Sequence, residues 1–332
     1  MALSDLIDNS VFAEAKNVKI KYDWNDGDPW VRILDDGKGM TEEKLIQAMR
    51  VGSSSPNEDR NPKDLGRFGL GLKTASWSQC KYLLVRTKTQ EGEISSRYWD
   101  LDHVEKSNRW EIGKSLNKEQ ENLVSPISEY NSGTVVIWKK LDRFFDNSPK
   151  VSLSYLIFNR RFLKEVVPYV EMVFNKLLGK GKNKINIFVG EHKCEPWDPY
   201  LLKNTFTRTL YKEKFENDRI KVTPYVLPHF SNRDEKENEE GAGPLGWNAQ
   251  QGFYVYRNDR MIVSGGYLNL GGLKPEEHFK LARIELEISN QMDHEWDLDV
   301  RKAIARPPEN LKKRSMKSIS LLIIFRKRKR NY

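Results

Sequence analysis

The segment Gly66-Arg67-Phe68-Gly69-Leu70-Gly71-Leu72-Lys73 places three glycines within six residues, directly before an amphipathic helical stretch. Glycine tolerates positive φ angles and lets the backbone approach a ligand closely. The N-terminus of the following helix would offer unpaired N–H groups and a positive dipole end to an anion. The segment therefore predicts a phosphate-binding turn, although a glycine run alone is equally typical of a tight turn without a ligand.

Two common phosphate-binding motifs do not fit this segment. A Walker loop ends in contiguous Gly-Lys-Thr, but here Leu72 separates Gly71 from Lys73, and residues 57–65 are polar where a buried strand should precede the loop. The dinucleotide motif Gly-x-Gly-x-x-Gly has the opposite glycine spacing. A third kind of site is needed.

The composition describes a polar chain with room for roughly two domains, since it has 332 residues and a typical domain has about 150. Charged residues make up 31% of it, and no apolar run approaches the roughly 18 to 20 residues of a membrane span. A secretory leader is not recognisable. The two cysteines, Cys80 and Cys194, are too few for a disulfide framework. We therefore expect a cytoplasmic protein without a membrane partner.

The net charge of +9 is located in the last residues of the chain. Residues 312–332 contain nine Lys or Arg and no acid, so the preceding residues sum to zero. Such a basic tail can follow a nucleic-acid backbone. A solvated, partly disordered end is the alternative interpretation.

The first half of the chain reads as one α/β domain over residues 1–145. A helix over residues 2–15 places Asp5 and Asn9 four residues apart on one face, and Thr41 is expected to cap a second helix. A mobile loop is expected at residues 51–65. The other expected elements are a helix at 70–79 and strands at 18–22, 30–34, 82–87, 94–101 and 133–138.

The second half predicts a helical connector at 146–184, in which Pro168 starts or kinks a helix. A second α/β domain at 185–308 would contain strands at 185–189 and 282–288 and a hairpin turning at Asn258-Asp259. The acidic residues 232–246 resemble a surface loop. Residues 309–332 form the basic tail.

Four motifs stand in order along the chain, namely Asp5 with Asn9, Asp35-x-Gly37-x-Gly39, Gly66-x-x-Gly69-x-Gly71, and Gly133-Thr134. Their order and spacing resemble those of the GHKL ATPases, the superfamily of DNA gyrase, MutL, heat-shock chaperone ATPases, histidine kinases and MORC proteins. Residues 6–10, 16–18 and 69–73 are similar to MORC-like and related prokaryotic ATPases. The resemblance implies an α+β sandwich of the Bergerat ATP-binding type, followed by a transducer-like α/β domain.

The resemblance also assigns roles within an ATP site. It implies that Asp35 accepts the adenine amine, with Gly37, Gly39 and Met40 beside the base and the hydroxyl of Thr134 supporting the aspartate. It implies that Asn9 offers its oxygen to Mg²⁺, which prefers oxygen ligands. The phosphates would lie against the glycine-rich segment, with contacts from Gly66, Arg67, Phe68, Gly69, Leu70, Gly71 and Lys73.

Asp5 departs from the family pattern, because the ATPase branch usually has glutamate at this position as the general base. Aspartate is one methylene shorter, and a positioned base contributes about 10²–10⁴-fold to a rate. Slow hydrolysis is therefore expected, with Asp8 as a weaker candidate base. A non-hydrolysing nucleotide-dependent scaffold, or a chaperone-like ATPase, is the alternative.

Residues 254–260 and 296–302 resemble the transducer domain of gyrase and MutL relatives, in which a lysine reaches the γ-phosphate. Lys302, or alternatively Arg301, would take that part, and a basic surface pair is the competing interpretation. The resemblance further implies a lid that closes over ATP, a homodimer formed on ATP binding, and a DNA-linked or defence-related task. Dimerising relatives carry an N-terminal arm, for which Met1 leaves no room, so either the dimer differs or the natural chain is longer.

Overall fold

The computed structural model describes residues 2–50, 71–142, 151–181, 183–216, 218–268 and 274–289. The chain divides into two compact units, of which unit 1 comprises Met1–Val167 with Leu178–Cys194 and unit 2 comprises Pro168–Leu177 with Glu195–Tyr332. Among the described residues, no helix combines the length and apolar character needed to cross a bilayer. Each unit is a mixed α/β structure built on its own sheet.

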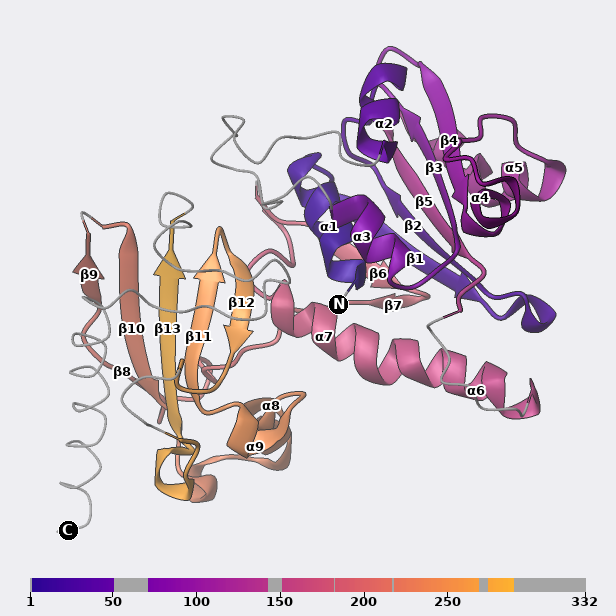
Figure 1. Cartoon of the computed structure of the whole chain (residues 1–332). Helices are drawn as coiled ribbons and strands as arrows, with labels where there is room; N and C mark the ends of the chain where they lie inside the picture. Colours follow the sequence, from indigo (N-terminus) through magenta and orange to yellow (C-terminus); the bar gives the residue numbers. More distant parts are fainter. Residues whose placement is uncertain are drawn as a thin grey trace, which may run out of the picture. The chain divides into compact units, whose positions relative to one another are not determined.

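Unit 1 is built on a seven-stranded sheet in the order β4-β3-β5-β2-β1-β6-β7 (Figure 1). All neighbours are antiparallel except β1 and β6, which run parallel. The strands predicted in the first half of the chain are confirmed. The strands are β1 (Asn17–Asp23), β2 (Trp30–Asp35), β3 (Tyr82–Lys88), β4 (Ile94–Asp100), β5 (Gly133–Lys139), β6 (Asn186–Val189) and β7 (His192–Lys193).

Helices α2 (Glu42–Met49) and α3 (Gly71–Trp77) pack on one face of this sheet, and α3 packs against α1 (Ala2–Phe12). Two tryptophans of the sheet donate hydrogen bonds to α2 and α3. Trp138 Nε1 of β5 donates to Ser76 Oγ of α3, and Trp99 Nε1 of β4 donates to the Met49 carbonyl of α2. Thr41 caps α2 by accepting from the Lys44 amide, as predicted. A single turn η1 (Asn25–Gly27) lies between β1 and β2, and α4 (Leu101–Ser107) follows β4.

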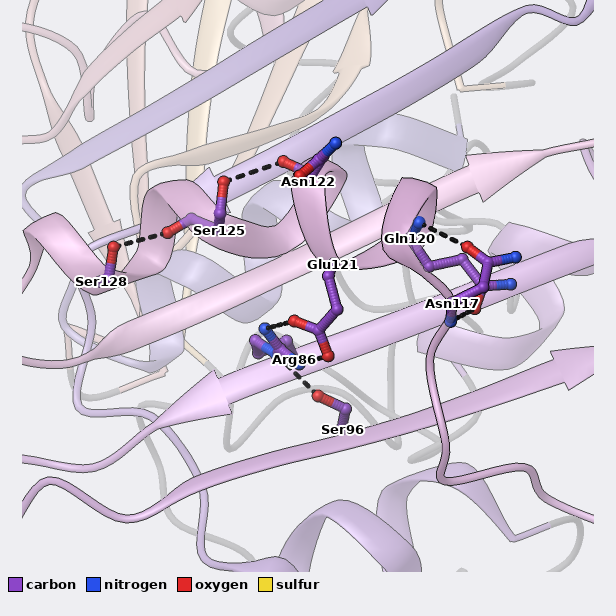
Figure 2. A network of polar contacts seen from close by, with 8 residues as sticks. All are labelled: Arg86, Ser96, Asn117, Gln120, Glu121, Asn122, Ser125 and Ser128. Carbon is purple, nitrogen blue, oxygen red and sulfur yellow. Dashed lines mark hydrogen bonds and ion pairs between the residues drawn. The ribbon is translucent and has the colours of Figure 1, made fainter.

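The opposite face is covered by α5 (Lys118–Val124) and the 3₁₀ turn η2 (Ser125–Glu129), which sequence patterns did not predict. Val124 and Ile127 pack there with Leu84 and Ile137 of the sheet. Figure 2 shows Arg86 of β3 facing Glu121 with two hydrogen bonds, at 2.7 and 2.8 Å, while its Nε donates to Ser96. Asn117 and Gln120 form a capping box that starts α5. Both faces of the central strands are therefore buried.

A nearly continuous helical stretch follows, made of α6 (Val151–Arg161), a π turn η3 (Phe162–Val166) and α7 (Val167–Val173). Phe162 stacks on Tyr22 of β1 with ring centroids 3.7 Å apart. Pro168 has no N–H to donate four residues back, and the π turn ends just before it. The sequence analysis placed the start of the second domain at residue 185. In the structure, the strand that follows this residue, β6, pairs with β1 inside unit 1.

Unit 2 contains a six-stranded sheet in the order β12-β11-β13-β10-β8, with β9 also paired to β10 (Figure 1). One face buries an apolar cluster that includes Val222, Phe253 and Leu286. The turn predicted at Asn258-Asp259 joins β11 to β12, with φ of 48° and 63°. The strands are β8 (Arg208–Thr209), β9 (Glu213–Phe215), β10 (Ile220–Val226), β11 (Gly252–Arg257), β12 (Arg260–Ser264) and β13 (Ala282–Ile288).

The surface loop predicted for residues 232–246 is wrong, because this segment contains helix α8 (Glu235–Ala242). Asp234 accepts from the Glu237 amide, and Glu237 accepts from the Asp234 amide. This capping box, with acids in the first turn, stabilises the helix despite its polar sequence. The remaining elements are η4 (Phe230–Asn232), α9 (Gly246–Ala249) and η5 (Glu277–Phe279).

Candidate functional site

Asp35, the last residue of β2, is a buried carboxylate with 7% of its surface exposed. Ser10 Oγ of α1 donates to its Oδ2 at 3.0 Å, and the Gly37 amide donates to its Oδ1 at 2.9 Å. Burial raises the pKa of Asp35 to about 6, although the bonds from Gly37 and Ser10 act in the opposite direction. In the part of the chain that the structure describes, no Lys, Arg or His forms an ion pair with this carboxylate.

The turn after Asp35 is held on both sides by backbone contacts. Asp36 accepts the backbone amides of Lys16 and Asn17 at 2.7 and 2.8 Å, and the Lys38 amide donates to the Ala13 carbonyl. A Cβ on Gly37 would lie 2.7 Å from the Ala13 Cβ. The packing of the turn therefore requires glycine here whether or not a ligand is present.

Gly39 has a φ of +69°, and a Cβ at this position would collide with the backbone carbonyl of Lys88. The amide of the next residue, Met40, donates to Thr87 Oγ1 at 2.8 Å. The end of β3 therefore fixes the far end of the turn. Sequence reasoning selected Gly39 and Met40 but missed Thr87, because strand pairing brings Thr87 there from 47 residues along the chain.

Thr134 lies directly opposite Asp35 in the pairing of β5 with β2, and its backbone slightly lowers the pKa of the carboxyl group against the larger effect of burial. Gly133 precedes it with a φ of +155°, where a Cβ would collide with the Asp35 carbonyl. The structure thus brings together Asp35, Thr134 and the turn ending at Met40. Ser10, the residue after Asn9, also belongs to this group and was missed.

Helix α1 brings Asp5 and Asn9 to the same region of unit 1. Leu6 and Ile7 are buried in the core, Asn9 is exposed and Asp5 is half-buried. Residues four apart lie on one helix face, so the Asp5 carboxylate and the Asn9 amide share the less buried side. Asp8 is 1% exposed, which leaves it less accessible to water than Asp5.

The glycine-rich segment lies mostly outside the described residues. Gly66, Arg67, Phe68, Gly69 and Leu70 belong to the part that is not described, as do the predicted loop 51–65, Arg301, Lys302 and the tail 312–332. Gly71 begins α3, and Lys73 is the third residue of this helix.

Lys73 is buried, and its Nζ donates to the Arg50 carbonyl at the end of α2. Burial lowers the pKa of this ammonium group. In the structure, Lys73 thus connects the residue before the predicted loop to the helix after it.

Residues 1–134 match the family described as "Histidine kinase-, DNA gyrase B-, and HSP90-like ATPase". The chain is 30% identical over 95 residues to the ATPase morc-1 of Caenorhabditis elegans, which covers 29% of this chain and 11% of that protein. It is 29% identical over 206 residues to the DNA mismatch repair protein MutL of Dictyoglomus turgidum, covering 58% of this chain and 31% of that protein. The chain thus spans less than a third of the length of either relative.

Among solved structures, the ATPase region of Saccharomyces cerevisiae topoisomerase II is similar with a TM-score of 0.49 and 12% identity. That alignment covers 92% of this chain and 76% of the topoisomerase chain. The likeness to this family rests on the sequence match over residues 1–134, which contain Asp5, Asn9, Asp35 and Thr134. Residues 1–134 of this chain are therefore similar to the GHKL superfamily of ATPases.

Proposed function

We propose that unit 1 binds ATP together with Mg²⁺. The observation that supports this function is that the Asp35 carboxylate is buried. A buried carboxylate is costly unless it is paired or fully hydrogen-bonded, yet no cation pairs with Asp35 among the residues described. Each carboxylate oxygen can accept two hydrogen bonds, so lone pairs remain beside the bonds from Ser10 and Gly37. The exocyclic amine of adenine is a donor suited to them.

In this proposal the base lies against Asp35, Thr134 and the backbone of the turn from Gly37 to Met40. The phosphates lie against the glycine-rich segment that ends at Gly71, at the start of α3. The similarity of residues 1–134 to an ATPase family supports this arrangement.

The residues of α1 fit a magnesium ion. Mg²⁺ prefers oxygen ligands, retains several waters and is commonly shared with substrate phosphates. The Asn9 side chain is exposed and offers a neutral amide oxygen. Bound Mg²⁺ would offset the negative charge of the triphosphate. Asn9 would hold the ion, and Asp5 would act as the base.

Asp5 is the residue that we propose as the general base for slow ATP hydrolysis. It is half-buried on the same face as Asn9, so its carboxylate can accept a proton from a water near the phosphates. Its side chain is shorter than the usual glutamate, which favours slow turnover. The same feature favours the second candidate function, a nucleotide-dependent scaffold that does not hydrolyse ATP.

Beyond the site, we propose a MORC-like, DNA-linked protein in which ATP closes a lid and promotes a homodimer. Support comes from the similarity to an ATPase named morc-1 and to a DNA mismatch repair protein. The basic residues 312–332 are the proposed contact with nucleic acid.

Calorimetric titration with ATP and Mg²⁺ tests the binding proposal. Asp35→Asn should weaken ATP binding by about tenfold or more, since a hydrogen bond to a charged group contributes about 1.5 to 3 kcal/mol. Asp23→Asn, an exposed aspartate in β1, is the matched control and should bind like the wild type. A folded Asp35→Asn variant with wild-type affinity would disprove the assignment of Asp35 to the base. Phosphate release by the wild type then separates the ATPase from the scaffold.

A further inference from the structure

Thr87, at the carboxyl end of β3, has a hydroxyl group that is fully enclosed, with 0% of its surface exposed. Its Oγ1 accepts from the Met40 amide at 2.8 Å. The same atom lies 3.1 Å from the Gly133 carbonyl oxygen and 3.3 Å from Thr134 Oγ1. One hydroxyl therefore joins the turn that follows Asp35 to the first residues of β5.

The register of the sheet places Thr87 in line with two residues of the proposed site. Asp35 of β2 is opposite Thr134 of β5, and Thr134 is opposite Thr87 of β3. Residues directly opposite one another on neighbouring strands carry their side chains on the same face of the sheet. We call Asp35, Thr134 and Thr87 the polar row.

The hydrogen-bond directions in the polar row follow from the one hydrogen that each hydroxyl carries. The Met40 amide can only donate to Thr87, and the Gly133 carbonyl can only accept. The Thr87 hydrogen is therefore assigned to Gly133, the shorter of its two remaining contacts. The contact with Thr134 must then be donated by Thr134, whose hydroxyl has only lone pairs left for any other neighbour.

We propose that Thr87 is a positioning residue that makes the nucleotide site selective for a base carrying an exocyclic amine. This inference rests on the proposed function. With the Thr134 hydrogen directed to Thr87, the polar row offers a ligand only acceptors, namely the Asp35 carboxylate and the Thr134 lone pairs. The amine of adenine donates to such acceptors. The carbonyl that replaces it in hypoxanthine would face lone pairs instead.

Thr87 acts on the ligand through Thr134, because its own hydroxyl is enclosed by protein atoms. Without this hydroxyl, Thr134 is free to rotate and to donate outward, toward a carbonyl. The preference for adenine over hypoxanthine would then depend on Asp35 alone. A purely structural role for Thr87 would instead weaken all nucleotides equally.

The test compares ATP with ITP, which carries a carbonyl in place of the amine, on the full chain with Mg²⁺. In Thr87→Val the shape is kept and the hydroxyl is lost. The ratio of ATP to ITP affinity should fall about fivefold to tenfold, the effect of one neutral hydrogen bond. Affinity for inorganic tripolyphosphate should stay within about twofold, because that probe has no base. Thr87→Ser retains the hydroxyl and should restore the ratio.

Thr134→Val removes the group through which Thr87 is proposed to act. Adding Thr87→Val to it should leave the ATP to ITP ratio unchanged, since coupled residues are not additive. A wild-type ratio in Thr87→Val overturns the inference, as does a parallel loss for ATP, ITP and tripolyphosphate. Wild-type protein that binds no ATP rejects the proposed function itself. Should Thr87→Val fail to fold, Thr87→Cys carries the same comparison with a weakly bonding thiol.

Discussion

Replacing Asp35 with asparagine should stabilise the fold at neutral pH while it weakens ATP binding. The pKa of Asp35 lies at about 6, against an ordinary value of 3.8, because the carboxylate is desolvated. That difference corresponds to about 3 kcal/mol of unfolding free energy lost once the group is ionised in the folded state. Asparagine has nearly the same shape and carries no charge to desolvate.

The surroundings of Asp35 can accommodate the amide. Its oxygen can accept from the Gly37 amide as the carboxylate does, and its NH₂ group can donate to Ser10 Oγ. The Ser10 hydroxyl already has a second acceptor, the Leu6 carbonyl at 3.2 Å, for its own hydrogen. Few hydrogen bonds are therefore lost, and the stability gain should be a large part of the 3 kcal/mol.

The sign of the pH dependence follows from the raised pKa of Asp35. A carboxyl that binds its proton more tightly in the folded state contributes most to stability below pH 3.8. It loses that contribution as the pH rises toward about 6. The gain in unfolding free energy of Asp35→Asn over the wild type should thus be largest at pH 8 and about half as large at pH 5. ATP binding to the wild type should weaken below pH 6, because a protonated carboxyl accepts fewer hydrogen bonds.

Urea unfolding of both proteins at pH 8 and pH 5, without nucleotide, measures the effect. Asp36→Asn is the matched control, because Asp36 lies in the same turn and its carboxylate accepts two backbone amides. That variant should be less stable than the wild type at both pH values. An Asp35→Asn protein that is less stable than the wild type at pH 8 would refute the reasoning. So would a stability difference that does not change with pH.

Four further variants test the remaining assignments. Asp5→Asn should bind ATP like the wild type and lose phosphate release, and loss of binding would contradict its role as a base. Deleting residues 312–332 should flatten the salt dependence of DNA binding, because nine positive charges no longer displace counterions; full-length protein that binds no DNA at low salt contradicts this. Lys302→Ala should keep ADP affinity and lose the preference for ATP analogues, with Arg301→Ala run in parallel.

Local patterns predicted the strands β1 to β6 of unit 1, the cap at Thr41 and the hairpin turn at Asn258, because each depends on residues close together in the sequence. The two-residue strand β7 was not predicted. The helix α8 was missed, since its polar composition outweighed the capping signal of Asp234 and Glu237. The pairing of β6 with β1 could not be predicted, because no local pattern records a partner about 170 residues away.

The candidate site shows the same division between local and long-range information. Asp35 and Thr134 were found because their motifs are local and ordered along the chain. Ser10 and Thr87 were missed, although both bond to motif residues. A threonine at the end of a strand is commonplace, and only the sheet register places it beside Thr134. The residues that orient a site are thus harder to predict than those that contact its ligand.

The motif residues themselves divide into two groups with different physical tasks. Gly37 and Gly39 are required by contacts with Ala13 and Lys88 inside the protein, so a larger side chain there would distort the turn before any ligand arrives. Asp35 has the opposite character, since its buried charge costs stability and has no cation partner among the described residues. Loss of ATP binding on substituting a glycine would therefore report on the turn, whereas loss on substituting Asp35 in a more stable protein would report on the ligand.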